Sequence, residues 1–505
     1  MVGARAAGQE AIDDAVQQLP EGRAAATRLV DGPVAGRLAA AISATIGSGS
    51  WTLRLWDGRV VGPDTAESRF DLVFHARRGL DLLLSAAPER AFGRAYAEGL
   101  VDVEPLQPFL ELLSQATPVQ LLRGAPRLLL AGIALGARPV RSRSRSVEAR
   151  LRGVRHTPRR DAQAIRHHYD VPIEFYRLWL DSSLTYSCAY FRNREDDLET
   201  AQRAKLDLIC RKLRLQSGEH VLDIGCGWGS FLIHAAQNYG AHGVGITLSP
   251  SQATVARQRI HELGLDGRVD VRLADYREPL GRTFDAVASI GMLEHVGRAN
   301  MLRYARAIHA ALRPGGRALV HGITASPGGG ITRGSFVDTF IFPDGELEEA
   351  GFLSLQLDSA GLEVRDDENL REHYALTLGH WRQRLEAQWD EAERLVGLER
   401  LRVWRLYLSG AEVGFHRGTT AVHQFLAVKP DPQGDARLPL TRDDWYAPSP
   451  ASPPRPNGSS GPFWLPQRRP SLAPRRAPIA EREGDQGRQR QRTHQAQHGT
   501  GSHQT

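Results

Sequence analysis

The sequence predicts an α/β protein, with a doubly wound sheet preceded by a smaller module of mixed α and β structure. A short buried strand, a glycine turn and a helix follow one another in EHVLDIGCGWGSFLIHAAQNYG, residues 219–240. Strand-like and helix-like patterns alternate through the section that ends near residue 430. Before residue 137, two alternating runs flank a turn at Asp57-Gly58, and leucines recur at helical spacing.

Length and composition restrict the class of protein. At 505 residues, 41% of them hydrophobic, the chain is long enough for two folded domains plus tails. Three cysteines without a CxxC pair favour neither a disulfide framework nor a metal site, which fits a reducing cytoplasm. We find no signal peptide and no run of about 18–20 apolar residues. We therefore expect a cytoplasmic protein, peripheral to the inner face of the membrane.

Composition divides the chain into four sections. We expect an N-terminal lipid-binding or accessory domain at 1–137, an Arg/Ser-rich linker at 138–160, and a domain at 161–430 that holds nearly all the candidate chemistry. The basic tail at 447–505 has too few apolar residues to fold. Just before the linker lies the apolar run RLLLAGIALGARPV. A buried helix is the favoured interpretation of this run, and an interfacial anchor is the alternative.

The glycine turn is the strongest single motif. Gly225, Gly227 and Gly229 follow a buried strand in GxGxG spacing, which lets the backbone approach a nucleotide-like ligand closely. Asp223, at the strand end, is placed to meet the ammonium group of a methionine moiety. The pattern DxGCGxG resembles motif I of Rossmann-like methyltransferases, while a purely structural turn is the alternative. The resemblance implies binding of S-adenosylmethionine by Asp223, Gly225, Cys226, Gly227 and Gly229.

Two further segments are expected to contact the cofactor. Where many nucleotide-binding units carry an acidic residue, this chain has the polar segment Thr247, Leu248, Ser249 and, shortly after, Gln252. The amide of Gln252 can pair with ribose hydroxyls, while Ser249 can cap the following helix, and both can hold together. In VDVRLADYREPL, we expect Asp275 to accept the adenine amino proton and Tyr276 to stack on the ring.

The section from His167 to Phe425 closely resembles cyclopropane-fatty-acid and mycolic-acid cyclopropane synthases. The motifs that carry the resemblance occur in order: HHYDVPIEFYRLWLDSSLTYSCAYF, GITLSPSQ, GMLEHVG, HGIT, IFPDGEL, HYALTLGHW and WRLYLSGAEVGF. The N-terminal segment ERAFGRAYAEGLVDVEPL is similar to the longer members, which act on phospholipids. The resemblance implies transfer of a methyl(ene) group from S-adenosylmethionine to the cis double bond of an unsaturated acyl chain, forming a cyclopropane ring.

The resemblance also implies roles for particular residues. Tyr186 and Ser187 would touch the cofactor. A bicarbonate ion would be held beside the reacting carbons by Cys188, Glu294, His321, Ile323 and Tyr374, with backbone groups from Cys188 and Ile323. One departure is Ala411, where many members have cysteine. A mechanism with that thiol as nucleophile is therefore excluded here.

The implied chemistry explains the residue types. An alkene that attacks the methyl group leaves a carbocation, and a proton must then be removed for the ring to close. A charged side-chain base is costly to bury, whereas a small anion held by donors can take the proton at close range. Phe175, Tyr176 and Phe336 are candidates to shield the cation with their ring faces. Taken alone, Glu294 is better explained as a residue of a polar loop and His321 as a core histidine, and Tyr374 and Cys188 could be ordinary core residues. Only their joint occurrence at matching motif positions favours function.

Alternative functions remain open at this stage. A hydride shift before proton loss would give a methylene- or methyl-branched chain instead of a ring. Methylation of a small molecule or nucleic acid draws support from the net charge of +6 and the Arg-rich segments, but no nucleic-acid-binding module is recognisable. A catalytically silent lipid-binding protein is disfavoured by the intact glycine motif and Glu294. The expected partners are unsaturated phospholipid acyl chains, an anionic membrane and a second copy in a homodimer.

Overall fold

The computed structural model describes residues 29–30, 33–63, 67–85, 88–138, 147–169, 171–327 and 329–446. The tail predicted to be disordered at 447–505, the first 28 residues and residues 139–146 of the predicted linker lie outside this part. The described residues belong to one compact unit, which ends at Ser449. Among them, no helix is long and apolar enough to cross a membrane.

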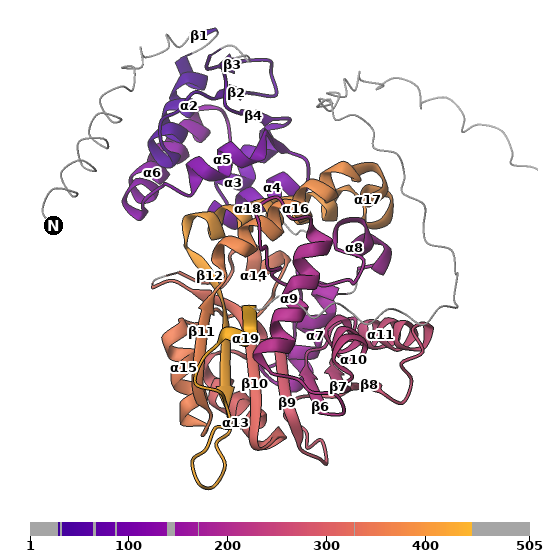
Figure 1. Cartoon of the computed structure of the whole chain (residues 1–505). Coiled ribbons are helices and arrows are strands. Elements are labelled where there is room, and N and C mark those ends of the chain that lie inside the picture. Colours follow the sequence, from indigo (N-terminus) through magenta and orange to yellow (C-terminus); the bar gives the residue numbers. More distant parts are fainter. Residues whose placement is uncertain are drawn as a thin grey trace, which may run out of the picture. The chain divides into compact units, whose positions relative to one another are not determined.

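A seven-stranded sheet forms the frame of the larger part, in the order β11-β12-β10-β9-β6-β7-β8 (Figure 1). The strands from β10 to β8 run parallel, and β12 lies antiparallel between β10 and β11. The nearly continuous runs of buried residues in β6, β7 and β9 suit strands that are covered on both faces. The strands are β6 (His220–Ile224), β7 (His242–Thr247), β8 (Val269–Leu273), β9 (Phe284–Ile290), β10 (Leu312–Ala325), β11 (Glu363–Asn369) and β12 (Thr420–Val428).

Helices cover both faces of this sheet and give it two hydrophobic layers. One layer packs α9, α10 and α11 on the sheet, and the other packs α13 and α15. The predicted doubly wound α/β fold is therefore confirmed. The helices of the two layers are α9 (Leu198–Lys212), α10 (Ser230–Tyr239), α11 (Pro250–Glu262), α13 (Met301–Ala311) and α15 (Ala350–Ser359). The other helices of this part are α7 (Pro158–Tyr169), α8 (Ile173–Trp179), α12 (Leu293–Val296), α14 (Phe336–Phe340), α16 (Arg371–Ala387), α17 (Trp389–Val396), α18 (Leu398–Arg417) and α19 (Asp443–Tyr446).

The N-terminal module is a smaller mixed α/β structure, as predicted. Its five strands have the order β1-β3-β2-β4-β5, and Gly58 takes a positive φ of 86° in the turn between β2 and β3. The strands are β1 (Leu29–Val30), β2 (Thr52–Arg54), β3 (Val60–Val61), β4 (Asp71–Phe74) and β5 (Val101–Glu104). The helices are α2 (Pro33–Ile46), α3 (Arg77–Leu83), α4 (Pro88–Ala97), α5 (Leu106–Leu113) and α6 (Pro118–Ala134).

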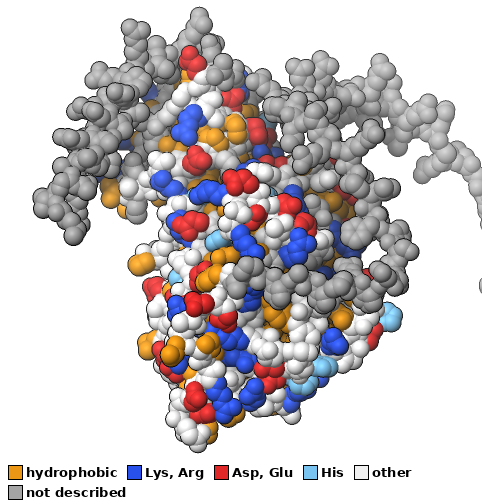
Figure 2. Space-filling view, viewed as in Figure 1, with side chains coloured by type: hydrophobic (Ala, Val, Ile, Leu, Met, Phe, Trp, Pro, Cys, Tyr) orange, Lys and Arg blue, Asp and Glu red, His pale blue; other side chains and the backbone are white. Residues whose placement is uncertain are grey.

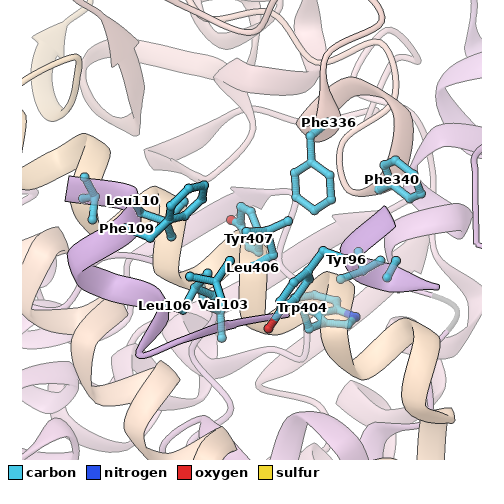
Figure 3. Close-up of a cluster of buried hydrophobic side chains, with 14 of the residues drawn as sticks. Tyr96, Val103, Leu106, Phe109, Leu110, Phe336, Phe340, Trp404, Leu406 and Tyr407 are labelled. Atoms are coloured by element: carbon cyan, nitrogen blue, oxygen red, sulfur yellow. The ribbon is translucent and has the colours of Figure 1, made fainter. Parts of the chain in front are cut away.

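The module shares a hydrophobic core with α14 and α18 (Figure 3). The side chains in this core come from α4, β5 and α5 on one side and from α14 and α18 on the other: Tyr96, Val103, Leu106, Phe109, Leu110, Phe336, Phe340, Trp404, Leu406 and Tyr407. Gly93 of α4 is needed for this packing, since a Cβ there would lie 2.2 Å from the Phe336 ring. The Arg402 guanidinium of α18 donates to the carbonyl of Val101 at 2.9 Å. The module is thus packed directly on helices that lie between β10 and β12 in the chain.

The helix α6 corrects the favoured interpretation of the run RLLLAGIALGARPV. The first eight residues of that run lie in α6, and Leu130 and Ile133 are 69% and 53% exposed. Only small residues, such as Ala131 and Gly132, are buried here. The helix prediction was right and the predicted burial was wrong, because the fully buried residues of α6 are small and most of its leucines are exposed, with Leu128 only partly buried against the core.

Candidate active site

The glycine loop joins the C-terminal end of β6 to α10 as predicted. Gly225, Gly227 and Gly229 have φ values of 82°, 53° and 83°, a region that side chains with a Cβ rarely adopt. A Cβ at Gly225 would lie 2.7 Å from the sulfur of Met292, so the loop packs closely against the loop after β9. The backbone amide of Gly225 donates to the carbonyl of Ile246 at 2.9 Å, which ties the loop to β7.

A pocket opens beside this loop at the carboxyl ends of the parallel strands, where ligands bind in doubly wound folds. The structure brings most of the predicted cofactor residues into its lining: Tyr186, Ser187, Asp223, Gly225, Cys226, Gly227, Thr247, Leu248, Gln252 and Tyr276. Three predicted residues, Gly229, Ser249 and Asp275, are not among the residues that line it.

Ser249 and Asp275 have evident structural partners. The Ser249 hydroxyl accepts from the backbone amide of Gln252 at 3.2 Å and caps α11, while the Thr247 hydroxyl donates to the side-chain oxygen of Gln252 at 2.8 Å. The Asp275 carboxylate accepts two hydrogen bonds from the Arg277 guanidinium, each at 2.7 Å, and a third from the Arg277 backbone amide at 2.9 Å. Ser249 thus orients Gln252 toward the pocket, and Asp275 positions Arg277, which itself lines the pocket.

A pair of buried, oppositely charged residues lies in the wall of the pocket. Asp223 is 2% exposed, and one of its carboxylate oxygens has no hydrogen-bond partner within the described residues. Burial raises the pKa of Asp223 to about 7. Lys205 of α9 is 1% exposed, donates to the Ser187 hydroxyl at 2.9 Å, and has its pKa lowered by burial to about 8. Each charge favours the ionised form of the other.

Sequence reasoning missed Lys205, although a signal was present. The buried face of α9 repeats at helical spacing through Leu198, Gln202, Leu206 and Ile209, and Lys205 falls on it. A lysine on an apolar helix face is rarely buried without a partner. The position of Lys205 on the buried face of α9 therefore indicates that its side chain points into the protein.

Four of the five residues predicted to hold an ion, Cys188, Glu294, Ile323 and Tyr374, lie near one another in the structure. Glu294 of α12 is 8% exposed, and one carboxylate oxygen accepts from the backbone amide of Ile323 at 2.7 Å. Its other oxygen is buried with no partner in the described part of the chain, and burial raises the pKa of Glu294 to about 7. Tyr374 of α16 is also buried, and its pKa is raised by burial and by the nearby Cys188 and Glu294.

His321 lies two residues before Ile323 on β10 and so on the same face of that strand. It is 1% exposed, and burial holds its pKa well below the ordinary value, so the ring is neutral. One ring nitrogen of His321 lies 3.1 Å from the side-chain amide nitrogen of Gln424 on β12. Because an amide N–H can only donate, this ring nitrogen accepts the hydrogen bond, and the proton of the neutral ring is on the other nitrogen. That other nitrogen has no partner among the residues that the structure describes.

A cluster of aromatic rings separates the pocket from the N-terminal module. Tyr186 lies at its centre, with ring centroids between 5.2 and 6.3 Å from six rings: His168, Tyr169, Tyr176, Trp179, Trp381 and Trp404. Phe175 and Tyr176, two of the predicted cation-shielding residues, belong to this cluster. The third, Phe336, instead packs against Gly93 and Phe340 at the contact with the N-terminal module.

Comparison with known proteins assigns the family. Residues 156–425 match the family described as mycolic acid cyclopropane synthetase. The chain belongs to this family. The matched residues make up more than half of the chain and end at Phe425, the end of the resemblance seen in the sequence.

Individual relatives extend this assignment. The chain is 48% identical over 296 residues to a protein of Pseudomonas putida named "Probable fatty acid methyltransferase", covering 58% of this chain and 75% of that protein. It is 38% identical over 405 residues to "Probable fatty acid methyltransferase Rv3720" of Mycobacterium tuberculosis, covering 78% and 94%. The solved structure of mycolic acid cyclopropane synthase CmaA1 complexed with SAH and CTAB is similar, with 33% identity, a TM-score of 0.50, and coverage of 53% of this chain and 97% of that one. The match to Rv3720 is long enough to include residues outside the family match.

Proposed function

We propose that the protein transfers a methyl(ene) group from S-adenosylmethionine to the cis double bond of an unsaturated phospholipid acyl chain and that the product is a cyclopropane ring. The observation that carries this proposal is Glu294, a buried carboxyl with one oxygen fixed by the amide of Ile323 and the other without a partner in the described structure. It lies between Met292 and His295, which line the cofactor pocket. This position next to pocket-lining residues supports a role for Glu294 as an acid–base group in the proposed reaction.

The pocket offers a suitable partner to each charged group of the cofactor's methionine moiety, the ammonium and the carboxylate. S-adenosylmethionine, when bound, would supply an electrophilic methyl group. The carboxylate of Asp223 is suited to its ammonium group, and the ammonium of Lys205 with the hydroxyl of Ser187 is suited to its carboxylate. Gln252 would pair with the ribose hydroxyls, and Tyr276 would lie against the adenine ring.

The group around Glu294 fits a small anion such as bicarbonate. His321 and Glu294 each have one buried polar atom without a partner among the described residues, and a neutral imidazole N–H can donate to an anion. With its pKa raised to about 7, Glu294 is partly protonated near neutral pH and can donate a hydrogen bond as well. Bicarbonate held there, with Tyr374 and the backbone of Cys188 and Ile323, would supply a base close to the reacting carbons.

The aromatic cluster suits a reaction that passes through a carbocation. Tyr176 and Trp228 have ring centroids 4.9 Å apart, and Trp228 also lines the pocket. Ring faces stabilise positive charge, and large buried rings exclude the water that would trap a cation. Tyr186 brings a hydroxyl and a ring to the same wall.

A branched product is the second candidate for the fate of the cation. Two relatives, 48% and 38% identical, are named fatty acid methyltransferases, and a third, 36% identical, is named tuberculostearic acid methyltransferase. Cyclopropane mycolic acid synthases are also 36% identical or less. All outcomes share the transfer of the methyl group. A hydride shift before proton loss gives a methylene branch instead of a ring, and a methyl branch needs a further reduction of that product by an external hydride donor.

Proton NMR of cellular lipids distinguishes these outcomes. The protein is expressed in bacteria whose phospholipids are rich in unsaturated chains, beside the Glu294→Gln variant as control. Cyclopropane protons far upfield support the ring, vinyl signals indicate a methylene branch, and a new methyl doublet indicates reduction to a methyl branch. Lipids that match those of the control would show that acyl chains of phospholipids are not the substrate.

A further inference from the structure

The helix α6 carries an exposed apolar surface that the proposed catalysis does not use. Of the thirteen large hydrophobic side chains exposed among the described residues, six lie on this one helix. They are Val119 (53% exposed), Leu121 (39%), Leu122 (75%), Leu129 (40%), Leu130 (69%) and Ile133 (53%). Scattered single leucines are normal on a protein surface, whereas a contiguous group of this kind marks a binding surface.

These side chains form a stripe rather than a random set. At about 100° per residue, five of the six fall within an arc of about 100°, and Leu121 lies apart from it. The opposite side of α6 contacts the module through small residues. A Cβ at Gly124 would lie 2.0 Å from the Thr45 hydroxyl of α2, and one at Gly132 would lie 2.6 Å from Leu84. Close packing on that side leaves the apolar stripe facing outward.

Positive charge borders the stripe. Arg123 and Arg127 are exposed and follow one edge of it by the same helical geometry. Between Glu111 and Glu148 the sequence holds six arginines and no acidic residue or lysine: Arg123, Arg127, Arg138, Arg141, Arg143 and Arg145. On the face of the molecule seen in Figure 2, acidic and basic side chains are instead interspersed. The segment around α6 therefore differs in charge from that face.

We propose that α6 docks the protein on an anionic lipid surface, with the apolar stripe inserted at the level of the headgroups and the arginines paired with lipid phosphates. An amphipathic helix with an apolar stripe and arginines along its edge is suited to lie in the plane of an interface. Arginine side chains reach the headgroups while their stems stay in apolar surroundings. A second copy fits less well, since a symmetric contact would bring two acid-free, Arg-bearing faces together.

The docking helix belongs to the module that packs on the catalytic part. The helices α4 and α5 of this module contact α18, and α18 supplies Trp404 to the aromatic cluster around Tyr186. Docking through α6 would hold the enzyme at the surface that contains its substrate. This consequence rests on the proposed phospholipid substrate, whereas the docking itself does not.

Co-sedimentation of the full chain with vesicles, without cofactor, tests the docking surface. One set of vesicles is phosphatidylcholine alone, and the other contains about one third phosphatidylglycerol. The variant Leu122→Glu/Leu130→Glu should bind the anionic vesicles at least about tenfold more weakly, because two inserted leucines become charged. Leu355→Glu is the control, a leucine on α15 that is also more than half exposed (59%), and should bind as the parent does. Arg123→Gln/Arg127→Gln should weaken binding about fivefold for each arginine removed, only on anionic vesicles.

Several outcomes would overturn the proposal. The proposal is wrong if the parent protein does not bind the vesicles or if the leucine variant binds them as well as the parent. It is also wrong if Leu355→Glu weakens vesicle binding as much as the leucine variant does. Sedimentation velocity is run in parallel. If the parent is a dimer and the leucine variant is a monomer that still binds vesicles normally, then a second copy of the chain covers α6 and lipid does not. The Glu294→Gln variant should bind vesicles like the parent, so failure of the catalytic proposal and failure of the docking proposal give different results.

Discussion

The wall of the cofactor pocket and the proposed ion site are built in opposite ways. Most of the predicted cofactor residues in the wall come from two short segments, the glycine loop after β6 and the polar turn after β7, and the glycine loop depends on backbone conformation as much as on side chains. The ion site collects Cys188, Glu294, Ile323 and Tyr374 from four separated segments. The first is a local structure that needs only its neighbouring strand, while the second exists only when the sheet and α16 are assembled. Binding and turnover should therefore respond to different substitutions.

Glu294→Gln is the strongest way to separate the two regions. Turnover should fall at least about a hundredfold, since an amide cannot exchange the proton that a carboxyl does. The affinity for S-adenosylhomocysteine, measured by calorimetry, should stay within about twofold, because Glu294 does not line the pocket. The exposed neighbour Glu349→Gln serves as control and should leave both quantities unchanged. A variant at Glu294 with full turnover would remove its role in holding the ion.

Gly227→Val tests the other region, the glycine loop in the wall of the cofactor pocket. A Cβ at Gly227 meets no atom within 4 Å, so the expected loss of cofactor affinity, about a hundredfold or more, would come from blocked approach and backbone strain rather than an internal clash. Gly264→Val separates these causes. Gly264 has a similar φ of 65° and equally open surroundings, but it does not line the pocket. The control should lose about 1 kcal/mol of stability and no affinity. Equal losses of affinity would mean that the glycine loop does not contact the ligand.

Lys205→Met tests whether the wall of the pocket binds the carboxylate of the cofactor's methionine moiety as well as its ammonium group. The affinity for S-adenosylhomocysteine should fall about tenfold, because a charged hydrogen bond is lost. Decarboxylated S-adenosylmethionine lacks the carboxylate, so its affinity should change much less. Lys212→Met is the control: this second buried lysine of α9 pairs with Glu368 and does not line the pocket. Equal losses for both ligands in Lys205→Met would show that Lys205 supports only the fold.

The stability of the protein without cofactor should depend on pH through the ion site. Because burial raises the pKa of Glu294 to about 7, its stabilising contribution is present below the unfolded pKa and is lost as the pH rises through 7. Urea unfolding should show a loss of a few kcal/mol between pH 5 and 8 that is absent in Glu294→Gln. Parallel pH dependences in the parent and the variant would mean that the carboxyl titrates normally.

The smallest effect is expected at Ala411. This residue is partly buried in α18 against the core that includes the aromatic cluster, where many members of the family have cysteine. Since methyl transfer needs no thiol nucleophile at this place, Ala411→Cys should change turnover by less than about twofold. A large gain in turnover would show that the thiol takes part in the reaction.

Local sequence predicted the parts of the molecule that depend on local conformation. The strand, glycine turn and helix of residues 219–240 follow from apolar runs and from φ values that favour glycine, so the part of the pocket wall formed by Asp223, Gly225 and Gly227 was predictable. The same reasoning placed Asp275 at the ligand, but it did not predict Arg277, which engages the carboxylate through a long side chain. The family resemblance supplied Glu294, His321 and Tyr374, because isolated polar residues give no periodic signal.

The sequence by itself determined the α/β class, the glycine loop and the family, because hydrophobic period and glycine spacing report local structure. Only the tertiary structure decided which polar side chains are buried with an unused hydrogen-bonding atom, as at Glu294 and His321, since burial depends on distant segments. It also decided the orientation of Lys205 and α6. A buried lysine needs a charged partner from another element, and the leucines of α6 are exposed because glycines make its contacts to the module.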